Sequence, residues 1–262
     1  MLIFRSSPCR LIEGLPVLFA NGLPLCAREE KVSHPMHASA ILLPKMIGGG
    51  LVMVRAETSL MDALKKARDA YGGFQRLQEI TTYQTEIARS RTVPDGHREK
   101  YIYRVYRAIG GRIRVEEEHH DGLIVTQVIN GLRGNKILQR PGEGIELVSE
   151  LSLDEMVASQ RAVKISPRVF LSHADEYDLA YLGTEEIEGF TGPCLEFLEE
   201  AARYYFHPRS YLCLRMLDAR EGSLWFYDDY RAVDGIATAH LVKVRQRDGT
   251  IVEDRVRMSQ YN

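Results

Sequence analysis

Apolar residues in this chain follow two different periods, and the first is helical. In the stretch from Ser59 to Ala70, Leu60, Leu64 and Ala67 recur at the three- and four-residue spacing of an amphipathic helix. A Gly-Gly pair follows and favours termination. Because Ser is a good N-cap, we expect one helix from Ser59 to Ala70.

From residue 80 onward, apolar and polar residues alternate with a period of two, the pattern of strands that bury one face. Gly, Pro, Asp or Asn bound these segments, and such residues form tight turns. Each segment is expected to be a strand paired with its neighbour through a hairpin. About eleven such strands are expected, at residues 80–90, 99–109, 112–120, 123–130, 176–189, 193–200, 202–208, 210–217, 223–231, 237–246 and 251–260.

The breaks between these strands have turn chemistry. Turns are expected at residues 94–96, 110–111, 121–122 and 247–249, and at Gly131 together with Gly134-Asn135. A second helix is expected from Leu153 to about Val163, because Asp154 and Glu155 stand in its first turn and Pro167 lies shortly beyond it.

These elements predict a mainly β fold. No helix alternates regularly with the strands, so a parallel α/β sheet is disfavoured. A long antiparallel sheet must curl or close to limit its exposed edges. We therefore expect an incomplete, half-open antiparallel β-barrel of about eleven strands, with two or three helices covering its concave face.

Composition narrows the class of protein. Hydrophobic residues make up 45% and charged residues 27% of the chain, as in a soluble globular protein. After residue 56 the chain holds 28 of the 34 Lys and Arg residues but 33 of the 36 Asp and Glu residues, a net charge of about −5. Because nucleic-acid binding depends on basic residues, no nucleic-acid partner is expected.

The first 56 residues are expected to be an extension that precedes the domain at 57–262. Residues 36–56, MHASAILLPKMIGGGLVMVRA, contain an apolar stretch and end in Val-Arg-Ala, which indicates an export signal and a periplasmic location. Two alternatives are a loosely packed extension and a true start at Met36.

Three segments of the domain are similar to the LolA/LolB-like outer-membrane lipoprotein-sorting superfamily. AYGGFQRLQEITTYQTE, at 70–86, resembles the opening of that family's mature chain. EEIEGFTGPCLEFLEE, at 185–200, and the following HPRSYLCLRMLD resemble its central strands. DDYRAVDGIATAHLVKVRQRDGTIVEDRVRMSQYN, at 228–262, resembles its closing pattern, except that Ala239 stands where relatives commonly have proline.

The resemblance implies a non-enzymatic carrier that holds the acyl chains of lipids or lipoproteins in an apolar concave cavity. The expected partners are such acyl chains and an envelope membrane protein, the protein is expected to be a monomer, and no cofactor is expected. Strand alternation suggests three groups of lining residues; the alternative is that they form an ordinary packed core. They are Tyr101, Tyr103 and Val105; Leu195 and Phe197; and Leu212, Leu214 and Met216.

Other chemistry has less support. The chain has no Gly-x-Ser-x-Gly, Walker A or His-Glu-x-x-His motif. Alternation would place Glu116, Glu118 and His120 on one face that could bind a divalent cation, but a solvated hairpin end is favoured, and no metal site is expected.

Two function classes remain as rivals to the carrier. An envelope sensor of the same fold is the first, and an unrecognised hydrolase using the region of His119 is the second. Ser172, His173 and Asp175 lie too close in sequence to predict a catalytic triad.

The two cysteines of the domain are expected to be buried free thiols. Cys194 and Cys213 lie on strands that a third strand separates, and strands two apart are about 9.6 Å from each other, beyond disulfide reach.

Overall fold

The computed structural model describes residues 45–47, 50–52, 56–108 and 111–262. Strands β1 (Lys45–Ile47) and β2 (Gly50–Val52) pair as a small antiparallel sheet. The expected extension and export signal lie largely outside the described residues, so both stay predictions.

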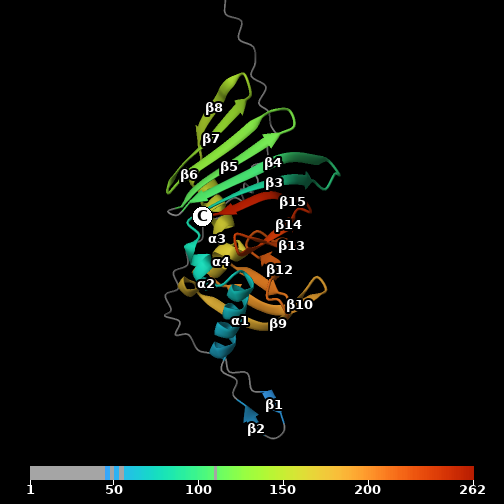
Figure 1. Cartoon of the computed structure of the whole chain (residues 1–262). Helices are drawn as coiled ribbons and strands as arrows, with labels where there is room; N and C mark the ends of the chain where they lie inside the picture. Colours follow the sequence, from blue (N-terminus) through green and yellow to red (C-terminus); the bar gives the residue numbers. More distant parts are fainter. Residues whose placement is uncertain (1–44, 48–49, 53–55, 109–110) are drawn as a thin grey trace, which may run out of the picture. The chain divides into compact units, whose positions relative to one another are not determined.

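A single antiparallel sheet of 13 strands contains most of the chain (Figure 1). The chain starts in the middle of this sheet at β3, proceeds outward to the edge strand β8, crosses to the opposite edge at β9 and returns strand by strand until β15 pairs with β3. The strands are β3 (Thr82–Thr92), β4 (Arg98–Ala108), β5 (Arg112–His119), β6 (Ile124–Asn130), β7 (Arg133–Arg140), β8 (Gly144–Glu150), β9 (Leu179–Ile187), β10 (Phe190–Phe197), β11 (Ala202–Phe206), β12 (Cys213–Asp218), β13 (Ser223–Val233), β14 (Ile236–Arg245) and β15 (Ile251–Tyr261).

The mainly β, half-open antiparallel architecture predicted from the sequence is confirmed, because among the described strands β8 and β9 each pair on one side alone and are the edges of an open sheet. Two strands, β7 and β8, were not predicted. The predicted turn at Gly134-Asn135 is wrong, since Gly134 lies in β7 opposite Ile129. A Cβ at Gly134 would lie 2.8 Å from Leu151 Cδ1 and 3.0 Å from Met156 Sδ, so glycine here permits close packing rather than a turn.

Four α-helices cover one side of the sheet, more than the two or three expected: α1 (Ala56–Ala70), α2 (Phe74–Glu79), α3 (Leu153–Lys164) and α4 (Pro167–His173), with a 3-10 helix η1 (Ala174–Glu176). Helix α1 begins three residues before Ser59, so Ser59 is not its cap. Helix α3 agrees with the prediction; Ser152 and Glu155 form a capping box at its start.

Two hydrophobic clusters join the helices to the sheet. The larger one packs α1, α2 and α4 against β10 to β14, and the smaller one packs Leu151 and Met156, at the start of α3, against Ile113 and Ile129. Both clusters therefore lie on the same side of the sheet, which we call the helix-facing side. None of the described helices has the length and apolar character needed to cross a membrane.

Candidate binding site

All but Leu214 of the expected lining residues of the C-terminal half are found in the larger cluster. Cross-strand pairing places Leu195 opposite Tyr204 and Tyr204 opposite Met216, so these side chains share the helix-facing side. Leu195 and Phe197 are 0% exposed and Met216 is 1% exposed. In this structure they are part of a packed core, the alternative that the sequence left open.

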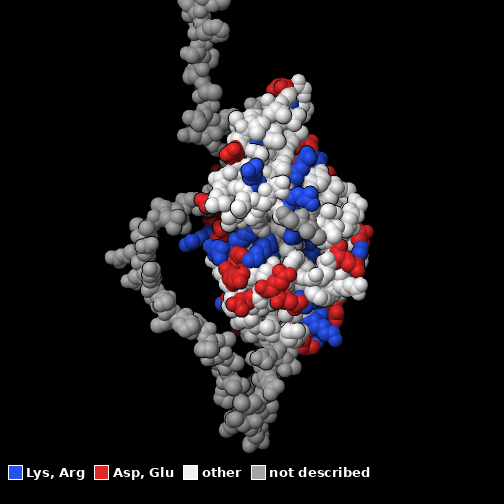
Figure 2. Space-filling model, turned by 90° about the vertical axis from the view of Figure 1, so that its left-hand side faces the viewer, with Lys and Arg blue, Asp and Glu red and all other residues white. Residues whose placement is uncertain are grey.

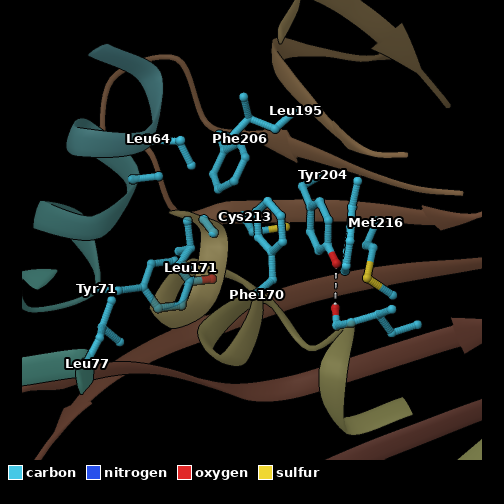
Figure 3. Packing of buried hydrophobic residues seen from close by; sticks show 14 of the residues in the cluster. Leu64, Tyr71, Leu77, Phe170, Leu171, Leu195, Tyr204, Phe206, Cys213 and Met216 are labelled. Carbon is cyan, nitrogen blue, oxygen red and sulfur yellow. Dashed lines mark hydrogen bonds between the residues drawn. The ribbon is translucent and has the colours of Figure 1, made fainter. Parts of the chain in front are cut away.

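Phe170 and Leu171 of α4 pack over these strands (Figure 3). The Phe170 ring stacks on Tyr204 with centroids 4.0 Å apart, and Tyr177, just beyond η1, stacks on Phe197 at 4.3 Å. The Tyr204 hydroxyl donates a hydrogen bond to the Ile165 carbonyl at 2.9 Å. Burying a side chain such as Phe170 contributes about 1.5–3 kcal/mol.

The alternation predicted for Leu212, Leu214 and Met216 is interrupted by a β-bulge. Phe206 pairs with Cys213 and Tyr205 with Arg215, which leaves Leu214 without a direct partner. Consequently Cys213 and Met216 are the buried positions, Leu212 lies at the margin of the cluster just before β12, and Leu214 is half-buried.

Tyr101, Tyr103 and Val105 lie on the helix-facing side of β4, since Val105 pairs with Val115, which packs against the smaller cluster. Tyr101 is buried, and the other two are half-buried. Burial raises the pKa of Tyr101 to about 12 and the pKa of Tyr103 further. These tyrosines are therefore neutral at physiological pH and present mainly aromatic surface.

A buried ion pair lies beside these tyrosines. The Arg89 guanidinium donates to both Asp254 carboxylate oxygens at 2.6 and 2.7 Å, and its centre lies 3.7 Å from the Tyr103 ring centroid. On the other side, His119 stacks on Tyr101 at 5.2 Å. The Glu117 carboxylate, 3.8 Å from His119 Nε2, raises the pKa of His119, and burial only partly offsets this effect.

Segments that carry the family resemblance meet in space. The φ of Gly72 is +110°, and a Cβ there would lie 2.3 Å from the Gly235 carbonyl oxygen, so the Gly-Gly break packs directly on the Val-Asp-Gly turn. The Tyr71 and Tyr230 hydroxyls lie 2.9 Å apart. The Asn262 carbonyl accepts hydrogen bonds from the backbone of residues 81 and 82, which ties the closing segment to the opening one.

A cavity of about 440 Å³, the strand-end cavity, lies where β3, β4, β5, β6 and β15 begin or end. Two of its residues, Ile113 and Ile129, belong to the cluster beneath α3. Its apolar and aromatic wall includes Tyr106, Ala108 and Val128, which cross-strand pairing places on the side of the sheet opposite the helices.

Three arginines, Arg107, Arg112 and Arg114, contribute to the lining of the strand-end cavity, and Arg114 pairs with Glu116. Burial lowers the pKa of Arg107, and the nearby Arg168 cation lowers it further. Arg168, from the first turn of α4, stacks over the rings of Tyr83 and Tyr261 at 4.2 and 4.5 Å. The sequence prediction missed both Arg107 and Arg168, although Arg107 is the next alternate position after Tyr101, Tyr103 and Val105.

A second cavity, of about 590 Å³, is lined mostly by residues of the opposite side of the sheet, including Ala88, Lys100, Glu118 and Arg255. Glu118 accepts from Arg104 at 2.8 Å, and Glu116 pairs with Arg114. Among the described residues no group of His, Cys, Asp and Glu side chains is arranged to hold a metal ion. Figure 2 shows Lys and Arg residues lying beside Asp and Glu residues on the face that it draws.

Ser172 and His173 are in contact, with Ser172 Oγ 2.7 Å from His173 Nδ1, but no catalytic triad results. The Ser172 hydroxyl also donates to the Val169 carbonyl at 2.8 Å. Asp175 is engaged elsewhere, because it pairs with Arg68 at 2.9 Å. The contact is thus a local feature of the end of α4.

The prediction for the cysteines is confirmed. Cys194 and Cys213 are buried free thiols, and β11 lies between their strands. Burial raises the pKa of the Cys194 thiol to about 12 and also raises that of Cys213, so neither is an activated nucleophile.

The sequence matches no family model and no curated protein. Among solved structures, the chain is similar to a LolA superfamily protein from Nitrosomonas europaea, with a TM-score of 0.50, 13% identity and coverage of 77% of this chain and 93% of that chain. It is also similar to a DUF1329 family protein from Desulfovibrio piger ATCC 29098, with a TM-score of 0.49, 17% identity and coverage of 77% and 92%. At such identities the likeness shows the fold alone, and at that level the resemblance expected from the sequence is confirmed.

Proposed function

We propose that this protein is a non-enzymatic binding protein of the cell envelope that holds the acyl chain of a lipid or lipoprotein in the strand-end cavity. The observation that carries the proposal is the wall of that cavity, to which Tyr106, Ala108 and the 37% exposed Val128 contribute apolar and aromatic surface. Apolar lining exposed to water is unfavourable by roughly 25 cal/mol per Å², and each buried CH₂ of a ligand contributes about 0.8 kcal/mol. An alkyl chain is therefore a favourable occupant.

The fold similarity to a LolA superfamily protein supports this choice over an enzyme. Within the described residues, Ser172 and His173 do not form a triad with Asp175, which is paired with Arg68. A binding site built from apolar contacts needs no reactive side chain. Localisation in the periplasm and the absence of catalysis belong to the same proposal.

The ligand-binding role of the residues predicted from the sequence remains part of this proposal. Tyr103 and Val105 are half-buried on the helix-facing side, close along β4 to the residues of the strand-end cavity. Leu195, Phe197 and Met216 belong to the cluster that Phe170 of α4 covers. Because Tyr106 and Val128 of the cavity face the other side of the sheet, an acyl chain would contact Tyr103 and Val105 only from the helix-facing side, and would reach the other three only by displacing Phe170.

Native mass spectrometry of the protein purified without detergent tests the proposal. We expect species heavier than the polypeptide by the mass of a lipid, and organic extraction should release the same acyl compounds. After delipidation, added acyl ligand should restore the heavier species. A delipidated protein that binds no acyl compound, charged or neutral, would contradict the proposed function.

A further inference from the structure

Basic residues gather on the side of the sheet that faces away from the helices, which we call the outer side. On β3, β4, β5 and β15, cross-strand register places six basic side chains there: Arg98, Lys100, Arg104, Arg112, Arg114 and Arg255. Arg257, in the bulge of β15, is a seventh, since it lies 3.9 Å from Glu86 of the same side. The acidic residues of the outer side on these strands are Glu86, Glu116, Glu118 and Glu253.

The helix-facing side of the same four strands has no such excess of positive charge. Register places three basic and three acidic residues on it: Arg89, Arg91 and Arg107, and Glu99, Glu117 and Asp254. The chain after residue 56 has a net charge of about −5. The outer side of β3, β4, β5 and β15 is therefore a positively charged surface on a negatively charged domain.

Much of the excess charge surrounds the cavity of about 590 Å³. Its outer-side lining includes four basic residues and two carboxylates: Arg98, Lys100, Arg255, Arg257, Glu118 and Glu253. Glu118 accepts a hydrogen bond from Arg104 at 2.8 Å, and Glu253 pairs with Arg255 at 2.8 Å. Both carboxylates of the cavity are thus already neutralised.

Arg98 and Lys100 remain as uncompensated cations at this cavity. Lys100 pairs with Ser90 across the strands, and the Arg98 guanidinium donates to the Ser90 hydroxyl at 3.2 Å. Within the described residues, neither cation forms an ion pair with a carboxylate. Both side chains are exposed, so they can reach an anionic group from outside the protein.

Apolar surface lies next to these cations on the same side of the sheet. Tyr106, Ala108 and Val128 of the strand-end cavity are outer-side residues, and Met258, also on the outer side, is 42% exposed. Along β4, Ile102 of the basic cavity and Tyr106 of the strand-end cavity are four residues apart, or about 13 Å at the rise of a strand. One face of the sheet thus combines a basic cavity with the proposed acyl-binding cavity.

We propose that the outer side of β3, β4, β5 and β15 docks on a membrane surface that contains anionic phospholipids, with the strand-end cavity turned toward the bilayer. Clustered Lys and Arg residues are attracted to such a surface, and their side chains form charge-assisted hydrogen bonds with phosphate groups. The inference rests on the proposed function and identifies the partner with which the acyl chain is exchanged. Charge complementarity and the shared side of the two cavities carry it.

Vesicle co-sedimentation tests the docking. The protein is mixed with vesicles of phosphatidylcholine alone and with vesicles that contain equal parts of phosphatidylcholine and phosphatidylglycerol. We expect at least about tenfold tighter binding to the anionic vesicles, and a loss of at least about tenfold in the double variant Arg98→Gln, Lys100→Gln. Added salt should weaken the binding, because it screens the charges.

The matched control is the double variant Arg209→Gln, Arg231→Gln. It removes the same net charge from exposed positions outside the four strands and should bind the anionic vesicles as the wild type does. Arg98 and Lys100 are exposed, so their double variant should melt at the wild-type temperature. Equal losses of binding in the two double variants would show that only net charge matters and would overturn the inference.

Tryptophan fluorescence tests which side meets the membrane. Met258→Trp places the reporter on the outer side, and Met61→Trp places it at a 61% exposed position of α1. We expect the emission of Met258→Trp to shift to the blue on anionic vesicles, and that of Met61→Trp to stay unchanged. A shift in Met61→Trp without one in Met258→Trp would show that another side docks, and would overturn the inference.

The outcomes separate the docking from the proposed function. A fluorescent fatty acid is titrated into each variant without vesicles, and the Arg98→Gln, Lys100→Gln protein should bind it as the wild type does. If the wild type binds both kinds of vesicle equally but still binds the fatty acid, the docking inference is overturned and the acyl-binding function stands. If it binds anionic vesicles but no acyl compound, the proposed function is refuted, and the inference that rests on it is overturned too.

Discussion

Arg161 connects α3 to the far half of the sheet, and its replacement by methionine should strongly destabilise the protein. The guanidinium donates to Asp218 at 2.6 and 2.9 Å, to the Glu200 carboxylate at 2.8 Å and to the Glu200 carbonyl at 2.7 Å. The side chains of Arg161, Asp218 and Glu200 are only 10%, 3% and 12% exposed. Arg161→Met would therefore leave two carboxylates desolvated without this cation.

The expected loss of unfolding free energy follows from the burial of the charged side chains rather than from the number of hydrogen bonds that Arg161 makes. Removing one member of a buried ion pair typically costs about 3–5 kcal/mol, because the remaining charge is uncompensated. Lys164 still pairs with Glu200 at 2.9 Å, and two backbone N–H groups still donate to Asp218, so we expect the lower end, about 3 kcal/mol.

Urea unfolding followed by circular dichroism measures this loss. The control is Arg231→Met, which breaks an exposed pair with side chains 60% and 48% accessible and should cost less than about 1 kcal/mol. If the free energy of unfolding of Arg161→Met falls no further than that of the control, the reasoning about the buried network is refuted.

Two further changes test other parts of the structure. Gly72→Ala should destabilise the protein by about 1–3 kcal/mol more than Gly73→Ala in urea unfolding. Both positions have positive φ, but only a Cβ at Gly72 meets the backbone of another segment. Equal losses of unfolding free energy in the two variants would refute the close approach. The pKa of His119 is raised by Glu117 above the ordinary value of 6.5, so its contribution to stability should be fully present below pH 6.5 and lost as pH rises through the higher folded value. His119→Gln should remove that part of the pH dependence between pH 5.5 and 8, and an unchanged pH profile would show that His119 is not its source.

Local sequence signals predicted much of the fold. Alternation identified eleven of the thirteen strands, and the acidic first turn located α3. Strands β7 and β8 were missed because glycines and Pro141 interrupt their apolar pattern, and because the space that Gly134 leaves for Met156 becomes visible only in the packed structure. The extra helix α4 follows Pro167, which the sequence indicated only as a stop.

The candidate site was harder to predict, because its parts meet only in three dimensions. Alternation placed Tyr103 and Val105 on a common side, and Arg107 continues the same series. Nothing in the local pattern indicates that Arg168, some sixty residues later, stacks on Tyr83 beside it. The bulge at Leu214 arises from the pairing of β11 with β12, and the sequence of a single strand does not reveal it.

The most direct test of acyl-chain binding is to fill the strand-end cavity. Ala108 lines this cavity and Ala88 lines the separate cavity of about 590 Å³; both are half-buried. In an equilibrium titration with a fluorescent fatty acid, Ala108→Trp should weaken binding at least about tenfold, which corresponds to roughly two CH₂ groups kept out of the site, while Ala88→Trp should bind as the wild type does. Wild-type affinity in Ala108→Trp, with the loss found in Ala88→Trp instead, would contradict the central claim.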